Sequence, residues 1–161
     1  MEPTILIGFG NIDRQDDGVA WHILARLSQR LGRETPSPEE GFWPGGEEYP
    51  HLLFALQLTP ELAETLSGYQ RVCFIDAHTG SVPHEVSLAP IQAEYQPSPM
   101  THHMTPMTVL SLCQTLYGHR IEGTLLSVRG YEFGFDRRLS PQTDALADLA
   151  AERLWDWLYQ A

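Results

Sequence analysis

Three places in the chain combine residue types that could bind a metal ion. Asp16 and Asp17 follow the first apolar run, Asp76 ends a later apolar run, and His102 and His103 stand just before a Thr-Pro dipeptide. Carboxylates and imidazoles together suit a divalent cation such as nickel or zinc. The loops at the carboxyl ends of parallel strands gather at one edge of a sheet, so we expect these groups to converge there.

Each of these residues also has a simpler explanation. Asp16 or Asp17 can cap the helix that follows, because a carboxylate at a helix start satisfies free backbone N–H groups. Asp76 can cap a turn at the end of its strand, and either His102 or His103 can be a surface histidine. The residue types alone leave both interpretations open.

The first loop has little in common with a phosphate-binding loop, although it contains Gly8-x-Gly10. A dinucleotide-binding loop usually needs a third glycine near position 13, where this chain has Asp13. Together with Asp16 and Asp17, that residue would repel a pyrophosphate. The loop therefore favours a cation over a nucleotide.

Strands and helices alternate along the sequence. An apolar run from Thr4 to the first glycine predicts a buried strand, and similar patterns predict strands at 52–58, 71–77, 85–91 and 124–128. Helical spacing of apolar residues predicts helices at 17–31, 106–117 and 140–158, with Leu149 among the inward-facing residues of the last. A capping residue followed by proline marks helix starts at Thr59, Thr105 and Ser140. This order predicts an α/β fold, a three-layer α/β/α sandwich with a mostly parallel central sheet.

Composition limits the class of protein. The 161 residues suit a single domain, and 42% hydrophobic residues suit a globular one. The net charge of -11, with arginine as the only basic residue besides histidine, argues against nucleic-acid binding. No basic leader precedes an apolar core and no run could span a bilayer, so we expect no membrane association and a cytoplasmic monomer. Cys73 and Cys113 are expected to be reduced core thiols.

The stretch 33–50 differs from the rest of the chain, with four prolines, three glycines and five glutamates. It has no hydrophobic periodicity, so we expect a surface loop or a partly mobile flap. Phe42, Trp43 and Tyr49 make it more aromatic than a simple linker, which allows a docking role.

Several motifs, taken in order, resemble the hydrogenase maturation proteases. The resemblance runs from the first strand to the last helix. The motifs that carry it are Gly8-Phe9-Gly10-Asn11, Asp16-Asp17-Gly18, Gln57-Leu58-Thr59-Pro60-Glu61-Leu62-Ala63, Phe74-Ile75-Asp76-Ala77, Thr101-His102-His103-Met104-Thr105-Pro106, Gly130-Tyr131-Glu132-Phe133 and Leu139-Ser140-Pro141.

The resemblance implies a function and a set of site residues. It implies an endopeptidase that removes a C-terminal extension from the large-subunit precursor of a nickel-iron hydrogenase, after nickel has been inserted. The nickel ligands carried over by motif are Asp17, Asp76 and His102, which act in catalysis through the metal. The spacing to the following Thr-Pro favours His102 over His103. The nickel comes with the substrate, so no resident cofactor is expected.

The chain also departs from the family, and two other functions stay open. Ala20 stands where the family often has glycine, and the 33–50 stretch is not a usual family segment, so partner recognition is the property most affected. One alternative is a non-enzymatic nickel-binding assembly factor for hydrogenase maturation. The other is a doubly wound module in which the acids bind ribose hydroxyls.

Overall fold

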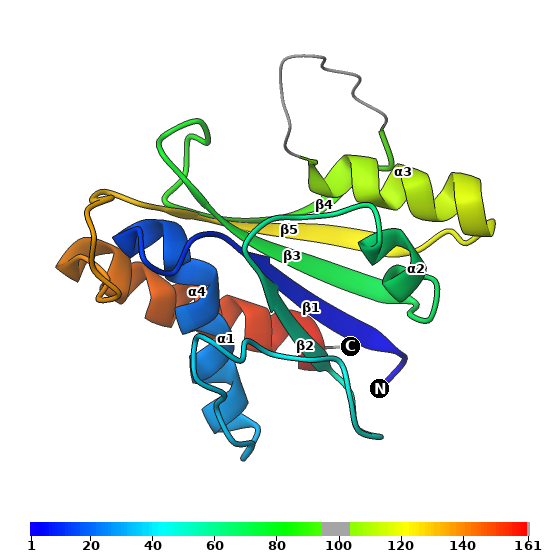
Figure 1. The fold of residues 1–161 in the computed structure, drawn as a ribbon, viewed down its shortest axis with the longest axis horizontal. Coiled ribbons are helices and arrows are strands. Elements are labelled where there is room, and N and C mark those ends of the chain that lie inside the picture. The colour runs from blue at the N-terminus through cyan, green and yellow to red at the C-terminus, as the bar shows by residue number, and fades with distance from the viewer. Residues whose placement is uncertain (95–103, 161) are drawn as a thin grey trace.

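The structure, a computed structural model, describes residues 1–94 and 104–160. A five-stranded sheet forms its centre (Figure 1). The strands are β1 (Thr4–Phe9), β2 (His51–Ala55), β3 (Arg71–His78), β4 (Val86–Ile91) and β5 (Glu122–Arg129). The helices are the short 3-10 turn η1 (Gln15–Gly18), α1 (Val19–Arg30), α2 (Leu62–Leu66), α3 (Pro106–Tyr117) and α4 (Pro141–Tyr159).

The sheet is mostly parallel, as predicted. Its strand order is β2-β1-β3-β5-β4, and only β4, at one edge, runs antiparallel to its neighbour. The central strands β1 and β3 are nearly continuous apolar runs because helices cover both of their faces.

Helices cover the two faces of the sheet in pairs. α1 and α4 lie on one face, and α2 and α3 lie on the other (Figure 1). Alternate residues of each strand therefore enter two separate cores: Leu6, Cys73 and Ile75 face α1 and α4, whereas Ile5, Ile7 and Phe74 face α2 and α3. This arrangement confirms the predicted three-layer α/β/α sandwich. None of the helices in the described ranges has both the length and the hydropathy needed to cross a membrane.

Two of the three predicted helix starts are confirmed. The hydroxyl of Thr105 accepts a hydrogen bond from the backbone N–H of Thr108, and Ser140 does the same for Thr143. The prediction at Thr59 is wrong, because α2 begins only at Leu62. The backbone N–H of Leu62 donates to the Thr59 carbonyl, three residues back, so the chain makes a tight turn before the α-helix starts.

Two further predictions from apolar pattern are wrong at their margins. β2 ends at Ala55 and not at residue 58, and the side chain of Leu56 is 65% exposed. In α4, Leu149 is 45% exposed, because its neighbour Ala150 occupies the inward position at that turn of the helix. Apolar pattern alone does not show which of several adjacent apolar residues faces the core.

The 33–50 loop contains no helix or strand but is only partly a surface feature. Phe42 is buried in the core beneath α1 and α4, and Tyr49 packs against the other core. Trp43 alone of the three aromatic residues is exposed, at 76%. Packing therefore explains two of the three aromatic residues.

Gly8 allows α1 to lie very close to β1. A Cβ atom at Gly8 would lie 3.0 Å from the Cβ of Ala20 and 2.9 Å from the Cδ1 of Leu24. Ala20 is fully buried at this contact. Ala20 is thus accommodated by a glycine on the facing strand.

We predict that Gly8→Ala lowers the free energy of unfolding by about 1–3 kcal/mol, because the added methyl overfills this contact. Ala20→Gly alone should cost about 1 kcal/mol through its helix propensity. Denaturant unfolding of both single variants and the double variant checks the coupling, and the double variant should lose less than the sum. Gly45→Ala, where the added Cβ would meet no atom within 4 Å, is the control. Additive losses would contradict the proposed contact.

Candidate functional site

A cavity of about 480 Å³ opens where the chain changes direction across the sheet. From β1 the chain crosses through α1 to β2 on one side, and β3 then pairs with β1 on its other side. In open α/β sheets, ligands bind at this kind of switch point, beyond the carboxyl ends of the strands. The lining residues are Phe9, Gly10, Asn11, Asp17, Leu56, Gln57, Asp76 and Met104.

Asp17 reaches this cavity from η1 and is held by the loop that precedes it. Its Oδ2 accepts a hydrogen bond of 2.8 Å from the backbone N–H of Asn11. Gly10 lies so close beneath it that a Cβ atom there would stand 2.1 Å from the Asp17 carbonyl oxygen, and its φ of +145° also favours glycine. The Gly8-x-Gly10 pattern is therefore explained by close packing within the protein.

Asp76 comes to the same cavity from the neighbouring strand β3. Burial raises the pKa of its carboxyl to about 7; the N–H of Ala77 acts in the opposite direction, and the negative charge of Asp17 adds to the rise. The two carboxylates thus repel each other across the cavity. A cation bound between them would remove that repulsion.

Asp16 points away from the cavity and is fully buried. Its carboxylate accepts hydrogen bonds from the backbone N–H groups of Tyr131, Glu132 and Ser140 and from the hydroxyls of Ser140 and Thr143. Burial by itself would raise the pKa of Asp16, but these hydrogen bonds outweigh it and lower the pKa. Asp16 is therefore a structural residue that joins the first loop to the loop before α4.

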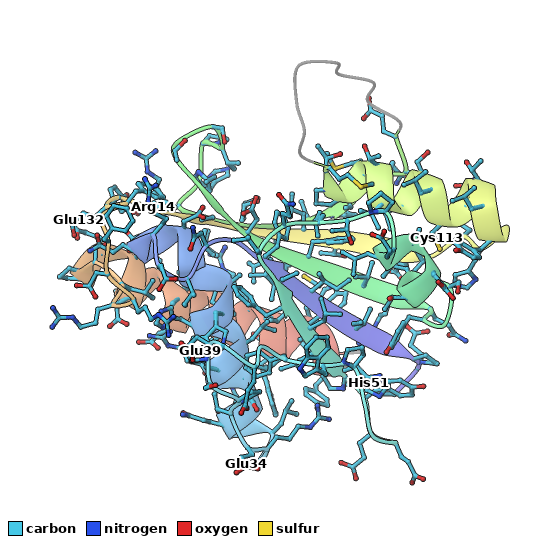
Figure 2. The ribbon with its side chains drawn as sticks, in the orientation of Figure 1. Arg14, Glu34, Glu39, His51, Cys113 and Glu132 are labelled. Atoms are coloured by element: carbon cyan, nitrogen blue, oxygen red, sulfur yellow. The ribbon has the colours of Figure 1, made fainter. Side chains whose placement is uncertain are left out.

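Further bonds join these two loops along their length. The backbone N–H of Gln15 donates to the Asp136 carbonyl at 2.8 Å, and that of Asp16 donates to the Glu132 carbonyl at 3.0 Å. The Nε of Arg14 donates to the Phe133 carbonyl. Figure 2 shows Arg14 and Glu132 together at this end of the molecule.

The predicted histidine ligands, His102 and His103, lie outside the described residues. Another histidine near the Asp76 loop, His78, has a structural role. The Nδ1 of His78 accepts from the N–H of Gly80, and its Nε2 therefore donates to the His84 carbonyl. In residues 1–94 and 104–160, no group of three Asp, Glu, His or Cys side chains is placed to hold a metal ion. The metal site of Asp17, Asp76 and His102 stays a prediction.

Some lining residues were not singled out as site residues from the sequence. Met104 and Gln57 belong to motifs that carry the family resemblance, and this membership is the feature of the sequence that could have indicated them. The sequence could not indicate that the backbone N–H of Asn11 bonds to Asp17, because nearly every residue type has a backbone N–H group.

The two cysteines have no place in this site. Both are free and fully buried, and burial raises the pKa of each thiol. Cys113 lies on α3, far from Arg14 (Figure 2), and is not among the residues that line the cavity. A cysteine nucleophile is not supported.

We predict that Asp16→Asn lowers the free energy of unfolding by about 2–4 kcal/mol, because an amide cannot accept all of the hydrogen bonds that the carboxylate accepts. In the folded protein the pKa of Asp16 is below its ordinary 3.8. The stabilisation by its ionised carboxylate is therefore present above about pH 4 and is lost as the pH falls below that value. Thermal unfolding from pH 3 to pH 8 measures it. Asp13→Asn, at an exposed ion pair with Arg137, should change little. An equal loss in both variants would contradict this role.

We predict the opposite effect for Asp76→Asn. The folded protein raises the pKa of Asp76, so its ionisation costs stability as the pH rises from about 4 through 7. The variant should be more stable than the wild type by about 1–2 kcal/mol at pH 8, less than the full shift implies because the side chain is half-buried. The gain should vanish near pH 4. Urea unfolding at both pH values checks this, with the exposed Glu122→Gln as control. A gain that is independent of pH would point to another cause.

Comparison with known proteins gives results at the level of structure. No protein-family model matches the chain, and no curated protein matches its sequence. Among solved structures, the hydrogenase maturating endopeptidase HybD from E. coli superposes with a TM-score of 0.67 at 17% identity, over 97% of this chain and 91% of that one.

Two structures from Thermococcus kodakarensis agree with this result. The [NiFe] hydrogenase maturation protease HybD from Thermococcus kodakarensis gives a TM-score of 0.61 at 17% identity, over 96% of this chain and 98% of that one. The protease HycI from the same organism gives 0.59 at 16% identity, over 96% and 93%. Over nearly its whole length, the chain therefore has the fold of the hydrogenase maturation proteases.

Proposed function

We propose that this protein is an endopeptidase that removes the C-terminal extension of a nickel-iron hydrogenase large-subunit precursor after nickel insertion. The observation that carries the proposal is the pair of carboxylates, Asp17 and Asp76, in one cavity at the switch point of this sheet. The likeness to HybD and HycI, which are named as hydrogenase maturation proteases, supports it.

The nickel of the substrate would be bound by Asp17, Asp76 and His102. Carboxylate oxygens and an imidazole nitrogen form a suitable donor set for nickel. Met104, which lines the cavity, follows His102 by only two residues in the sequence. This short connection supports His102 as the third ligand.

In this proposal the chain's own residues bind the metal and select the loaded precursor. The carboxylates of Asp17 and Asp76 repel each other less once a cation lies between them, which favours a substrate that carries nickel. A metal ion held in this way can orient the scissile peptide, polarise its carbonyl or activate a water molecule. No resident cofactor is needed, because the substrate itself carries the nickel ion that the site binds.

The proposal includes a cellular setting. Cys73 and Cys113 are both free and lie in the two separate cores on opposite faces of the sheet, which suits a reducing compartment. We infer that the protein acts in the cytoplasm, as a monomer, on a protein substrate.

We predict that the protein shortens the nickel-loaded precursor and leaves the nickel-free precursor intact, as measured by intact-mass spectrometry. Asp17→Asn, Asp76→Asn and His102→Ala should each reduce cleavage by at least about 100-fold, because each removes a metal ligand. Asp13→Asn, an exposed acid of the same loop, should retain activity.

The other outcomes separate the alternatives. Cleavage of both precursors would support peptidase activity but would reject the selection of the nickel-loaded precursor. Nickel-dependent binding without cleavage would identify an assembly factor. Neither binding nor cleavage would reject the proposed function.

A further inference from the structure

Arg129 ends β5 at the same edge of the sheet as the cavity. It pairs in register with His78, two residues beyond Asp76 on the neighbouring strand β3. Residues of β5 alternate between the two cores, with Leu126 and Val128 facing α1 and α4. Arg129 is therefore on the opposite face, which it shares with Asp76 and α3.

The surroundings of Arg129 hold its guanidinium group in a defined place. Its Cζ lies 4.9 Å from the centre of the Tyr131 ring, a cation–π contact. Gly80 is also in close contact, since a Cβ atom there would lie 1.9 Å from the Arg129 Nη1. The turn that contains Gly80 is fixed by buried His78, which accepts the Gly80 N–H. Any side chain at position 80 would displace the guanidinium group.

Among the described residues, no carboxylate forms an ion pair with this guanidinium group, and the nearby carboxylate of Glu85 accepts a hydrogen bond from the Tyr131 hydroxyl instead. The buried Nε of Arg129 has no hydrogen-bond partner among these residues. The rest of the chain, 95–103 and residue 161, contains no Asp or Glu. Burying part of an unpaired cation costs free energy, so stability alone does not explain the arrangement.

We propose that Arg129 binds a carboxylate of the substrate's C-terminal segment and so strengthens the binding of that segment beside the cavity. This inference rests on the proposed function. A guanidinium group recognises a carboxylate through two parallel hydrogen bonds, and carboxylates are the anionic groups of an unmodified polypeptide.

The sheet geometry sets the expected position of that carboxylate. Strand spacing and rise place the Cα of Arg129 about 8 Å from the Cα of Asp76. An extended peptide covers about 3.3–3.6 Å per residue. The bound carboxylate should therefore lie two to four residues from the peptide bond at the cavity. It is either an acidic side chain or the C-terminal carboxylate of the extension.

The test compares Arg129→Gln with Arg120→Gln. Arg120 is exposed, has no ion pair among the described residues and precedes β5 at the end of the sheet opposite the cavity. Each variant loses one positive charge, so Arg120→Gln controls for the change in net charge. Binding of the nickel-loaded precursor and the KM and kcat of its cleavage are measured for each. Arg129→Gln should weaken binding and raise KM by about 10-fold or more, with kcat nearly unchanged, and Arg120→Gln should match the wild type.

Altered precursors identify the carboxylate. One has every acidic side chain of the extension changed to its amide, and another has an amidated C-terminus. The precursor that lacks the bound carboxylate should bind the wild type and Arg129→Gln equally. An effect of Arg129→Gln that is the same with every precursor would overturn the inference, and so would an unchanged KM or an equal effect of Arg120→Gln.

Two further measurements keep the result decisive. If Arg129→Gln fails to fold, Arg129→Lys keeps the charge and loses the paired hydrogen bonds, so it should raise KM by a smaller factor and only for precursors that retain the carboxylate. If the wild type binds the precursor without cleaving it, the proposed peptidase activity is rejected. The comparison of binding between the wild type and Arg129→Gln still decides the role of Arg129. If the wild type does not bind the precursor, both proposals are rejected.

Discussion

The hydrogen bonds to the buried carboxylate of Asp16 determine how the loops beside the cavity are assembled. One side chain accepts bonds from the loop before α4 and from the capping serine of that helix. A buried charge is tolerated only when its acceptor sites are satisfied, so these segments must meet in one arrangement. The loop from β1 to α1 is thereby anchored on one side, and its next residue, Asp17, is directed into the cavity.

Adjacent acids can take such different roles because of the geometry of η1. Successive residues of a 3-10 helix point about 120° apart, so Asp16 faces the protein interior while Asp17 faces the cavity. The pKa of Asp16 is lowered by its donors, whereas that of Asp76, which has few donors, is raised by burial and by Asp17. The stabilising carboxylate of Asp16 and the carboxylates that line the cavity thus differ in their hydrogen-bond partners and not in residue type.

Residue pattern was sufficient to predict the layered fold and the convergence of Asp17 and Asp76. Parallel strands place their carboxyl ends together, and alternating elements leave few other arrangements. The pattern could not show that Asp16 bonds to residues more than a hundred positions away, because such contacts leave no local periodicity. It also misplaced the start of α2, where a tight turn at Thr59 precedes the helix. The assignment of His102 as a metal ligand stays a prediction because His102 lies outside the described residues.

The burial of both native thiols makes this protein well suited to site-directed labelling. Cys73 and Cys113 are fully buried with raised pKa values, so neither supplies an accessible thiolate at neutral pH. A single cysteine introduced at the cavity mouth, for example in place of exposed Leu56, would be the reactive one. Fluorescent or spin probes could then report on the approach of a partner protein without removal of the native cysteines.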